Sequence, residues 1–275
     1  MSKINEATLK GCYYREWTCG SEPKGIVLLV HGLGEHCERY NKLGSVLNQA
    51  GYDLSSIDLP SHGRSDGKRG HIDAFSDFNK AVLQLHSLIR DAHPNTAIHL
   101  LGHSMGGLIA SSVLLEHQDK FSSALLSGAA IQSPQEPPSW QVSLIRTIAK
   151  FAPKLGMLAL DASGISKDSA VVDDYMNDPL VNKGKLSAGF LSEMFATMNH
   201  VKDNAGTINL PLLIMHGSDD VMTAPAGSQL LYDTISSNDK SLKIYSGLLH
   251  EIFNEPEVDI VHFDVLNWLE SHTPS

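Results

Sequence analysis

The chain is poor in cysteine and in positive charge. Its three cysteines, Cys12, Cys19 and Cys37, form no CxxC pair, so we expect reduced packing residues rather than a zinc site or a disulfide framework. Lys and Arg number 21 against 31 Asp and Glu, which gives a net charge of −10 at pH 7. This balance argues against nucleic acid as a partner and against tight adsorption to anionic membranes.

Long apolar runs and a leader pattern are missing too. No stretch reaches about 18 uninterrupted apolar residues, so we expect no membrane span. The opening MSKINEATLKGCYY lacks a basic region followed by an apolar run and predicts no signal peptide, which favours a cytoplasmic location. With 275 residues, 42% of them hydrophobic, the chain is long enough to bury one large core.

The sequence does have a series of short apolar runs, each closed by glycine or aspartate. They lack polar alternation, which indicates strands buried on both faces of a parallel sheet. Helical patterns separate most of them, as at residues 75–93, where Ser76 or Asp77 is placed to cap the helix start. The alternation predicts an α/β fold with a doubly wound, mostly parallel sheet. Residues 9–20 predict a pair of antiparallel edge strands.

This alternation stops between Ile131 and Leu210. Two helical patterns lie in this stretch, which is too long for a simple loop. We therefore divide the chain into a core, residues 1–130 and 211–275, and an inserted helical cap, residues 131–210, that covers one edge of the sheet. One face of the first helical pattern either packs on the sheet or meets a lipid surface; its apolar residues are Trp140, Leu144, Ile145, Ile148 and Phe151.

The segment LLGHSMGGLIA, residues 100–110, places one serine among glycines. Gly102, Ser104 and Gly106 form a G-x-S-x-G pattern after a predicted strand and before a predicted helix, which is the context of a nucleophile elbow. Small neighbours permit the sharp turn that lifts the serine hydroxyl above the sheet. Ser104 is therefore the candidate nucleophile, and the alternative is an inert serine in a glycine-rich turn.

A serine nucleophile needs a base and an acid. In this kind of fold the acid and the histidine follow the nucleophile in chain order, on loops after later strands. His250 lies in the loop directly after the run SLKIYSG and is the candidate base. The run PLLIMHG is followed by Asp219 and Asp220, and their spacing alone cannot decide which of them is the acid.

Acyl transfer also needs donors for the oxyanion. We expect the backbone N–H groups of Leu33, in the loop HGLGEH, and of Met105, directly after the serine, to supply them. His31 and His36 in the same loop lack the carboxylate or cysteine pattern of a metal site. No metal or other cofactor is implied.

Four segments in this order resemble the monoacylglycerol lipase branch of the serine α/β-hydrolases, which also contains bacterial lysophospholipase-like proteins. They are VHGLGEHCERY, GHSMGG, HGSDDVMTAPAGS and GLLHEIFNEPE, and the resemblance also covers the cap segment ISKDSAVVDDYMNDPLVNKGKLS. It implies the α/β-hydrolase fold and hydrolysis of a lipid ester, monoacylglycerol first, with a lysophospholipase or a short-chain carboxylesterase as alternatives. Transient contact with a lipid surface through the cap is compatible with this activity.

The resemblance also assigns residues. The family's spacing from a glycine and a proline selects Asp220 as the acid. It further implies that Glu35, Arg39 and Tyr175 bind a glycerol head group. For Glu35 and Arg39 an ion pair that orients the oxyanion loop is an equal alternative, and for Tyr175 the alternative is packing within the cap. Phe253 occupies the position of a second histidine in the animal enzyme.

Overall fold

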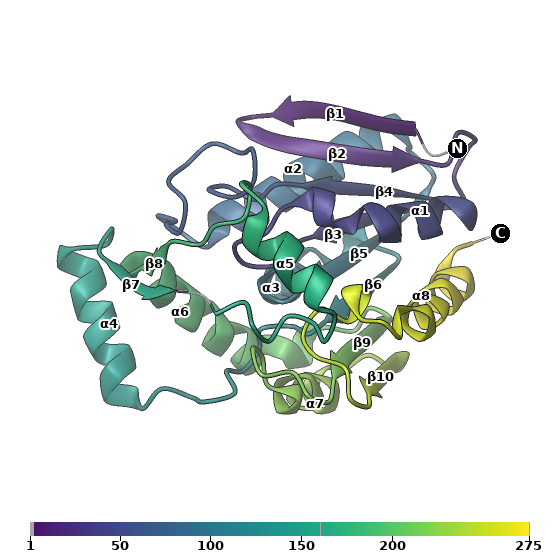
Figure 1. Cartoon of the computed structure of the whole chain (residues 1–275). Helices are drawn as coiled ribbons and strands as arrows, with labels where there is room; N and C mark the ends of the chain where they lie inside the picture. Colours follow the sequence, from purple (N-terminus) through teal and green to yellow (C-terminus); the bar gives the residue numbers. More distant parts are fainter. Residues whose placement is uncertain (1–2, 160, 275) are drawn as a thin grey trace.

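The computed structural model describes residues 3–159 and 161–274, and these residues form an eight-stranded central sheet (Figure 1). The strand order is β1-β2-β4-β3-β5-β6-β9-β10. The parallel part contains β3 (Gly25–Val30), β4 (Tyr52–Ile57), β5 (Ala97–His103), β6 (Ser123–Ser127), β9 (Leu212–Gly217) and β10 (Lys240–Tyr245). The strands β1 (Lys3–Leu9) and β2 (Cys12–Thr18) form an antiparallel hairpin at one edge. The predicted mostly parallel sheet is confirmed. Residues 9–20 hold only the turn and the second strand of the antiparallel pair, because the first strand is Lys3–Leu9.

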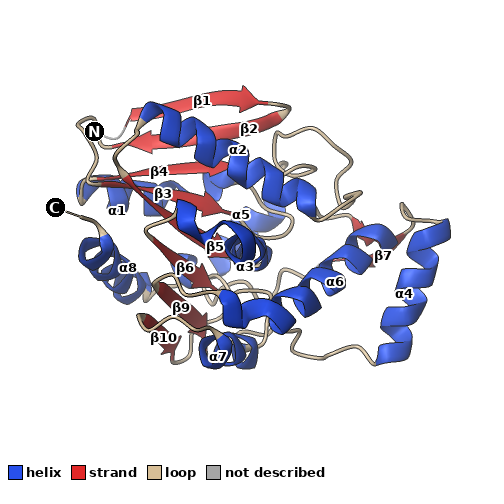
Figure 2. Ribbon diagram, turned by 180° about the vertical axis from the view of Figure 1, so that it is seen from behind, coloured by secondary structure: helices blue, strands red, loops and turns tan. Residues whose placement is uncertain are grey.

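Helices cover both faces of the sheet (Figure 2). One face packs against α1 (Asn41–Gln49) and α8 (Val258–His272), and the other against α2 (Ser76–Ala92), α3 (Met105–His117) and α7 (Pro225–Thr234). Successive side chains of a strand point to opposite faces. Leu28 and Leu29 of β3 accordingly join the two different cores. Burial on both sides explains why the strand sequences show no polar alternation.

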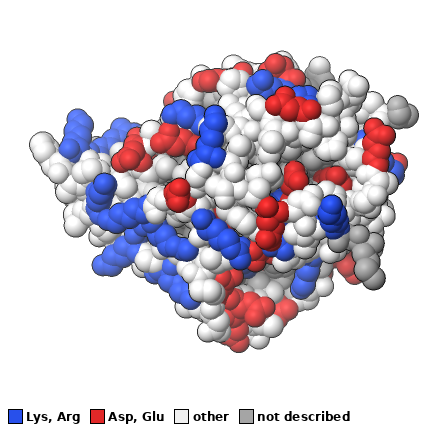
Figure 3. Space-filling view, turned by 90° about the horizontal axis from the view of Figure 1, so that it is seen from above, with Lys and Arg blue, Asp and Glu red and all other residues white. Residues whose placement is uncertain are grey.

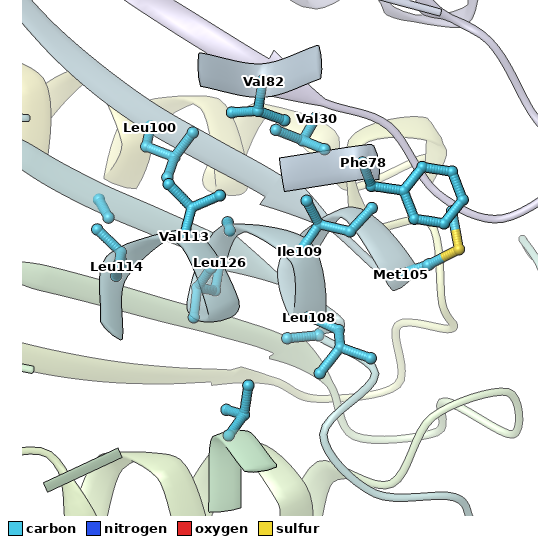
Figure 4. Packing of buried hydrophobic residues seen from close by; sticks show 14 of the residues in the cluster. Val30, Phe78, Val82, Leu100, Met105, Leu108, Ile109, Val113, Leu114 and Leu126 are labelled. Atoms are coloured by element: carbon cyan, nitrogen blue, oxygen red, sulfur yellow. The ribbon is translucent and has the colours of Figure 1, made fainter. Parts of the chain in front are cut away.

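The helix α3 is the best-buried helix of the molecule, and it carries the start of the candidate site. Figure 4 shows its apolar side chains between strands β3, β5 and β6 and helix α2. Leu108, Ile109 and Val113 are almost fully buried, and burying each such side chain stabilises the fold by about 1.5–3 kcal/mol. The N-terminus of α3 is therefore fixed against the sheet.

The predicted capping of α2 is wrong. The helix begins at Ser76 itself, and the residue before it, Phe75, is buried and makes no side-chain capping bond. Phe75 is held instead by tertiary contacts. Its ring packs edge-on against Phe78, and its N–H donates to the Glu193 carboxylate at 2.9 Å.

The insertion between β6 and β9 is not purely helical as predicted. It contains α4 (Ser139–Phe151), β7 (Gly156–Ala159), α5 (Ser169–Asn177), β8 (Lys185–Ser187) and α6 (Ala188–Asn204). The strands β7 and β8 pair as an antiparallel ribbon, and both are too short to leave a strand pattern in the sequence. Phe190 and Val201 of α6 belong to the main core, so part of the insertion is continuous with the sheet domain.

The apolar face predicted on α4 is partly covered and partly exposed. Ile145 and Ile148 are half-buried, whereas Trp140, Leu144 and Phe151 are 64%, 50% and 85% exposed. Helix α4 packs against α6, and this packing covers only part of the face. Within residues 3–159 and 161–274, no helix is both long and apolar enough to cross a bilayer.

Candidate active site

Ser104 is the single residue between β5 and α3. Its backbone has φ 55° and ψ −120°, a combination that a residue with a side chain rarely adopts and that stores strain. Its N–H donates to the carbonyl of Ser127 at 2.9 Å, and its carbonyl accepts the N–H of Ala130 at 3.0 Å. The neighbouring strand therefore holds the strained turn, and the half-buried Ser104 lines a cavity above the sheet.

Two glycines allow this turn to close. A Cβ on Gly106 would lie 2.0 Å from the carbonyl oxygen of Val30, and a Cβ on Gly102 would lie 2.4 Å from that of Gly106. Side chains at either position would push α3 away from the sheet. The strand–turn–helix setting predicted for Ser104 is therefore the one that the structure has, and it depends on glycine.

His250 and Asp220 meet beyond the ends of β9 and β10. His250 Nδ1 lies 2.7 Å from Asp220 Oδ2, and both side chains are buried. Asp219 is exposed and accepts a hydrogen bond from the Ser218 hydroxyl instead. The structure thus brings Asp220 to His250, a choice that spacing alone left open.

Two further side chains hold Asp220, and the sequence reasoning missed both. Asp220 Oδ2 lies 3.0 Å from His216 Nε2 and accepts the Thr223 hydroxyl at 2.8 Å. Burial alone would raise the pKa of Asp220, but hydrogen bonds from His216 and His250 hold it well below its usual range. The position of His216 at the end of β9, four residues before Asp220, is a signal that could have indicated this contact.

Ser104 and His250 line the same cavity. His103 lies beside them, with its ring centroid 4.8 Å from that of His250. Burial, followed by the proximity of His250, lowers the pKa of His103 to about 4, so His103 is neutral at pH 7. Among the described residues the Ser104 hydroxyl makes no hydrogen bond, and such serine–histidine contacts commonly tighten only around a bound substrate.

Leu33 and Met105 line this cavity. Met105 is the first residue of α3, and the first N–H groups of a helix have no acceptor within the helix. The loop of Leu33 passes close to the serine because residue 32 is glycine, since a Cβ there would lie 3.2 Å from Ser104 Cβ. Both predicted oxyanion donors are therefore beside the candidate nucleophile.

An ion-pair cluster lies behind this loop. The Glu35 carboxylate accepts the Gly32 N–H at 2.6 Å, the Tyr40 hydroxyl at 2.7 Å and Arg39 Nη1 at 3.0 Å. Arg39 also makes a two-pronged pair with Glu251, at 2.5 and 2.8 Å. Burial would raise the pKa of Glu35, but Arg39, His103, His31 and the Tyr40 hydroxyl together outweigh it and lower the pKa to about 2.

Only two of the three residues implied in head-group binding line the cavity. Glu35 and Tyr175 line the cavity, whereas Arg39 lies behind them, its Cζ 4.7 Å from the centre of the Tyr175 ring. Glu251 lines the cavity as well and was missed, although it directly follows His250. Phe253 is buried and stacks on His262.

The cavity has a volume of about 190 Å³ and two unlike ends. One end contains the polar groups just described. The other is apolar, and most of its wall comes from the insertion, namely Leu158, Ile165, Leu186, Leu191, Met194 and Phe195. The described residues contain no cluster of His, Cys, Asp and Glu suited to a metal ion.

This sheet, with a serine at a strained strand–helix turn and a buried His–Asp pair, defines the serine hydrolase class of α/β protein. The family described as serine aminopeptidase, S33, matches residues 21–257, and the chain belongs to this hydrolase family. It therefore has the α/β-hydrolase fold.

Several proteins similar to this chain are named as monoacylglycerol or monoglyceride lipases. A monoacylglycerol lipase of Mycolicibacterium smegmatis is 37% identical, over 94% of this chain and 92% of its own length. The mouse monoglyceride lipase is 32% identical, over 94% and 86%. The crystal structure of a monoacylglycerol lipase from Paleococcus ferrophilus matches with a TM-score of 0.85 and 33% identity, covering 95% of this chain and 99% of that one.

Proposed function

We propose that this chain hydrolyses fatty-acid esters, with monoacylglycerol as substrate, through an acyl-enzyme on Ser104. The observation that carries this proposal is a single cavity that joins Ser104 and the His250–Asp220 pair to an apolar wall. The relatives named above support the choice of ester.

In this mechanism the Ser104 hydroxyl attacks the ester carbonyl while His250 takes its proton. Asp220, buried against Nδ1 of His250, fixes the imidazole tautomer and stabilises the imidazolium. The N–H groups of Leu33 and Met105 stabilise the oxyanion, each contributing about 3 kcal/mol in comparable sites. His250 then protonates the departing alcohol, and water releases the fatty acid by the reverse sequence.

Glu35 and Arg39 orient the oxyanion loop in this proposal. Glu35 is occupied by three donors, one of them the N–H of Gly32, so its main role is to fix the backbone before Leu33. Among the described residues the Tyr175 hydroxyl has no hydrogen-bond partner, although it lines the cavity. Tyr175 is therefore the group that we propose for contact with a glycerol hydroxyl.

Residues 131–210 form the cap of this enzyme, over a core of residues 1–130 and 211–275. Support comes from the cavity wall, because the insertion supplies most of its apolar side. That side accepts the acyl chain. We further propose a cytoplasmic enzyme that contacts lipid surfaces transiently through the cap.

The surface that would make this contact is the insertion tip, defined as residues 139–159 and 183–187. It contains Arg146, Lys150, Lys154, Lys183 and Lys185 and no Asp or Glu, in a chain of net charge −10. Figure 3 shows Lys and Arg gathered at the end of the molecule that carries α4. Exposed Trp140, Leu144 and Phe151 lie on the same helix, a combination typical of helices that bind anionic lipid interfaces.

Replacement of the nucleophile tests the proposed function. Ser104→Ala is expected to lower kcat for 1-oleoylglycerol at least about 10³-fold, measured as fatty-acid release, with folding checked by circular dichroism. Ser87→Ala, the same change at an exposed position on α2, serves as the matched control. A butyrate ester and oleoyl-lysophosphatidylcholine are assayed as alternative substrates beside 1-oleoylglycerol. A preference for either of them over 1-oleoylglycerol, or activity that survives without Ser104, contradicts the proposal.

A further inference from the structure

Glu251 combines three properties that the proposed mechanism does not use. It directly follows His250, it lines the polar end of the cavity, and its side chain is only 6% exposed. Both of its carboxylate oxygens receive Arg39, and Asn254 Nδ2 donates to Oε2 at 2.9 Å. These charge-assisted hydrogen bonds hold the carboxylate in place at the cavity wall.

The charges at this end of the cavity do not balance. Glu35 and Glu251 contribute two carboxylates, and both pair with the same guanidinium, that of Arg39. The described residues that line the cavity include Glu35 and Glu251 but no Lys or Arg. A substrate head group therefore meets the two anions at the wall, while the one cation lies behind them.

The same charged groups affect the pKa of the Tyr175 hydroxyl. Burial, followed by the charge of Glu35, raises the pKa of Tyr175, and the opposing effect of Arg39 is smaller. The hydroxyl is thus held in its neutral form first by burial and then by the charge of Glu35. A neutral hydroxyl can donate to a glycerol oxygen, but it cannot neutralise an anion.

We infer that Glu251, together with Glu35, determines head-group selectivity by excluding anionic groups. Hydroxyl-bearing and cationic alcohols are accepted at this end, and alcohols that carry a phosphate monoester are rejected. The inference rests on the proposed ester hydrolysis at Ser104. Like charges brought together in a desolvated site repel strongly, and salt screens a buried site only weakly.

The test compares three esters of one acyl chain below their micelle-forming concentrations, so that surface charge plays no part. They are 1-octanoylglycerol, 1-octanoylglycerol 3-phosphate and octanoylcholine, which carry neutral, anionic and cationic alcohols. For the wild-type chain we expect kcat/KM for the phosphate ester to be about 100-fold below that for the glycerol ester. Octanoylcholine is expected within about tenfold of the glycerol ester, which separates charge from size.

A substitution of Glu251 tests whether this residue causes the difference in kcat/KM between the glycerol and phosphate esters. Glu251→Gln removes one negative charge but keeps an acceptor for Arg39, and should lower the KM of the phosphate ester so that the gap shrinks about tenfold. Glu257→Gln makes the same chemical change at an exposed position on the same loop, outside the cavity, and should preserve the wild-type gap. Should Glu251→Gln fail to fold, the wild-type order of the three esters still decides whether anionic head groups are excluded.

Equal kcat/KM for the glycerol and phosphate esters overturns the inference and leaves the proposed function intact. The same holds if octanoylcholine is as poor a substrate as the phosphate ester, because size would then explain both. A folded Glu251→Gln variant with an unchanged gap overturns the assignment to Glu251. If no octanoyl ester is hydrolysed in a Ser104-dependent way, the proposed function fails, and the inference fails with it.

Discussion

At the scale of single residues, the candidate site depends on positions where almost no other side chain is possible. Ser104 carries the strained backbone, and Gly106 lets the helix behind it touch the sheet. Neither property depends on the reacting groups themselves. The first is held by backbone hydrogen bonds of Ser104 with Ser127 and Ala130, and the second follows from how closely α3 approaches the carbonyl of Val30.

Gly106→Ala is expected to destabilise the fold by about 2–3 kcal/mol, because its Cβ would have to displace the carbonyl of Val30 or α3 itself. It should also lower esterase activity, since the same shift moves Ser104. Gly206→Ala is the control, because the nearest atom to that Cβ is an ordinary 3.7 Å away. Urea unfolding measures both variants. Similar midpoints for the two would contradict this account of the turn.

At the scale of elements, α4 differs from every other long helix of the described chain in burying no residue. Its sequence gives it a clear apolar face, but the neighbouring α6 covers only part of it. The uncovered part coincides with the positive charge of the insertion tip. The net charge of the whole chain therefore does not describe the surface that would meet a lipid.

Replacing Trp140 and Phe151 by Ser is expected to reduce co-sedimentation with phosphatidylglycerol vesicles several-fold, because both side chains are exposed on the tip. Wild-type binding should weaken as salt rises. Hydrolysis of a soluble short-chain ester should stay unchanged. Phe263→Ser changes an equally apolar side chain that is 65% exposed on α8, and it should leave vesicle binding intact. Equal losses in both variants would rule out the tip as the contact surface.

At the scale of the whole molecule, buried histidines tie stability to pH. Burial lowers the pKa of His62 to about 3 and those of His99 and His103 to about 4. These groups are protonated in the unfolded chain below about pH 6.5 but remain neutral in the folded one. Their contribution to stability is therefore present above pH 6.5 and is lost as the pH falls towards 4.

His99 isolates this effect, because it is buried between Ser123 and Thr273, far from the cavity. His99→Gln should reduce the slope of unfolding free energy against pH by up to about 1.4 kcal/mol per pH unit between pH 4 and 6.5. Chemical denaturation at several pH values measures the slope. His200→Gln, at an exposed position on α6, is the comparison, and an identical slope in both variants would refute the linkage.

The sequence by itself determined the parts of this protein that depend on local order along the chain. The strand before Ser104, the helix after it and the glycines two residues to either side of it follow one another along the chain, so their spacing specifies the turn. The loop of Leu33 and the position of His250 after a strand are readable for the same reason. The parallel sheet followed from runs that are apolar on both faces.

Only the tertiary structure decided the contacts between distant segments. Arg39 and Glu251 are 212 residues apart, and Phe75 and Glu193 are 118 residues apart, so no periodic pattern records either pair. Exposure of α4 depends equally on what α6 leaves uncovered. The chemistry of the nucleophile is a property of neighbours in sequence, whereas the charge around it is a property of neighbours in space, since electrostatic interaction depends on distance and burial.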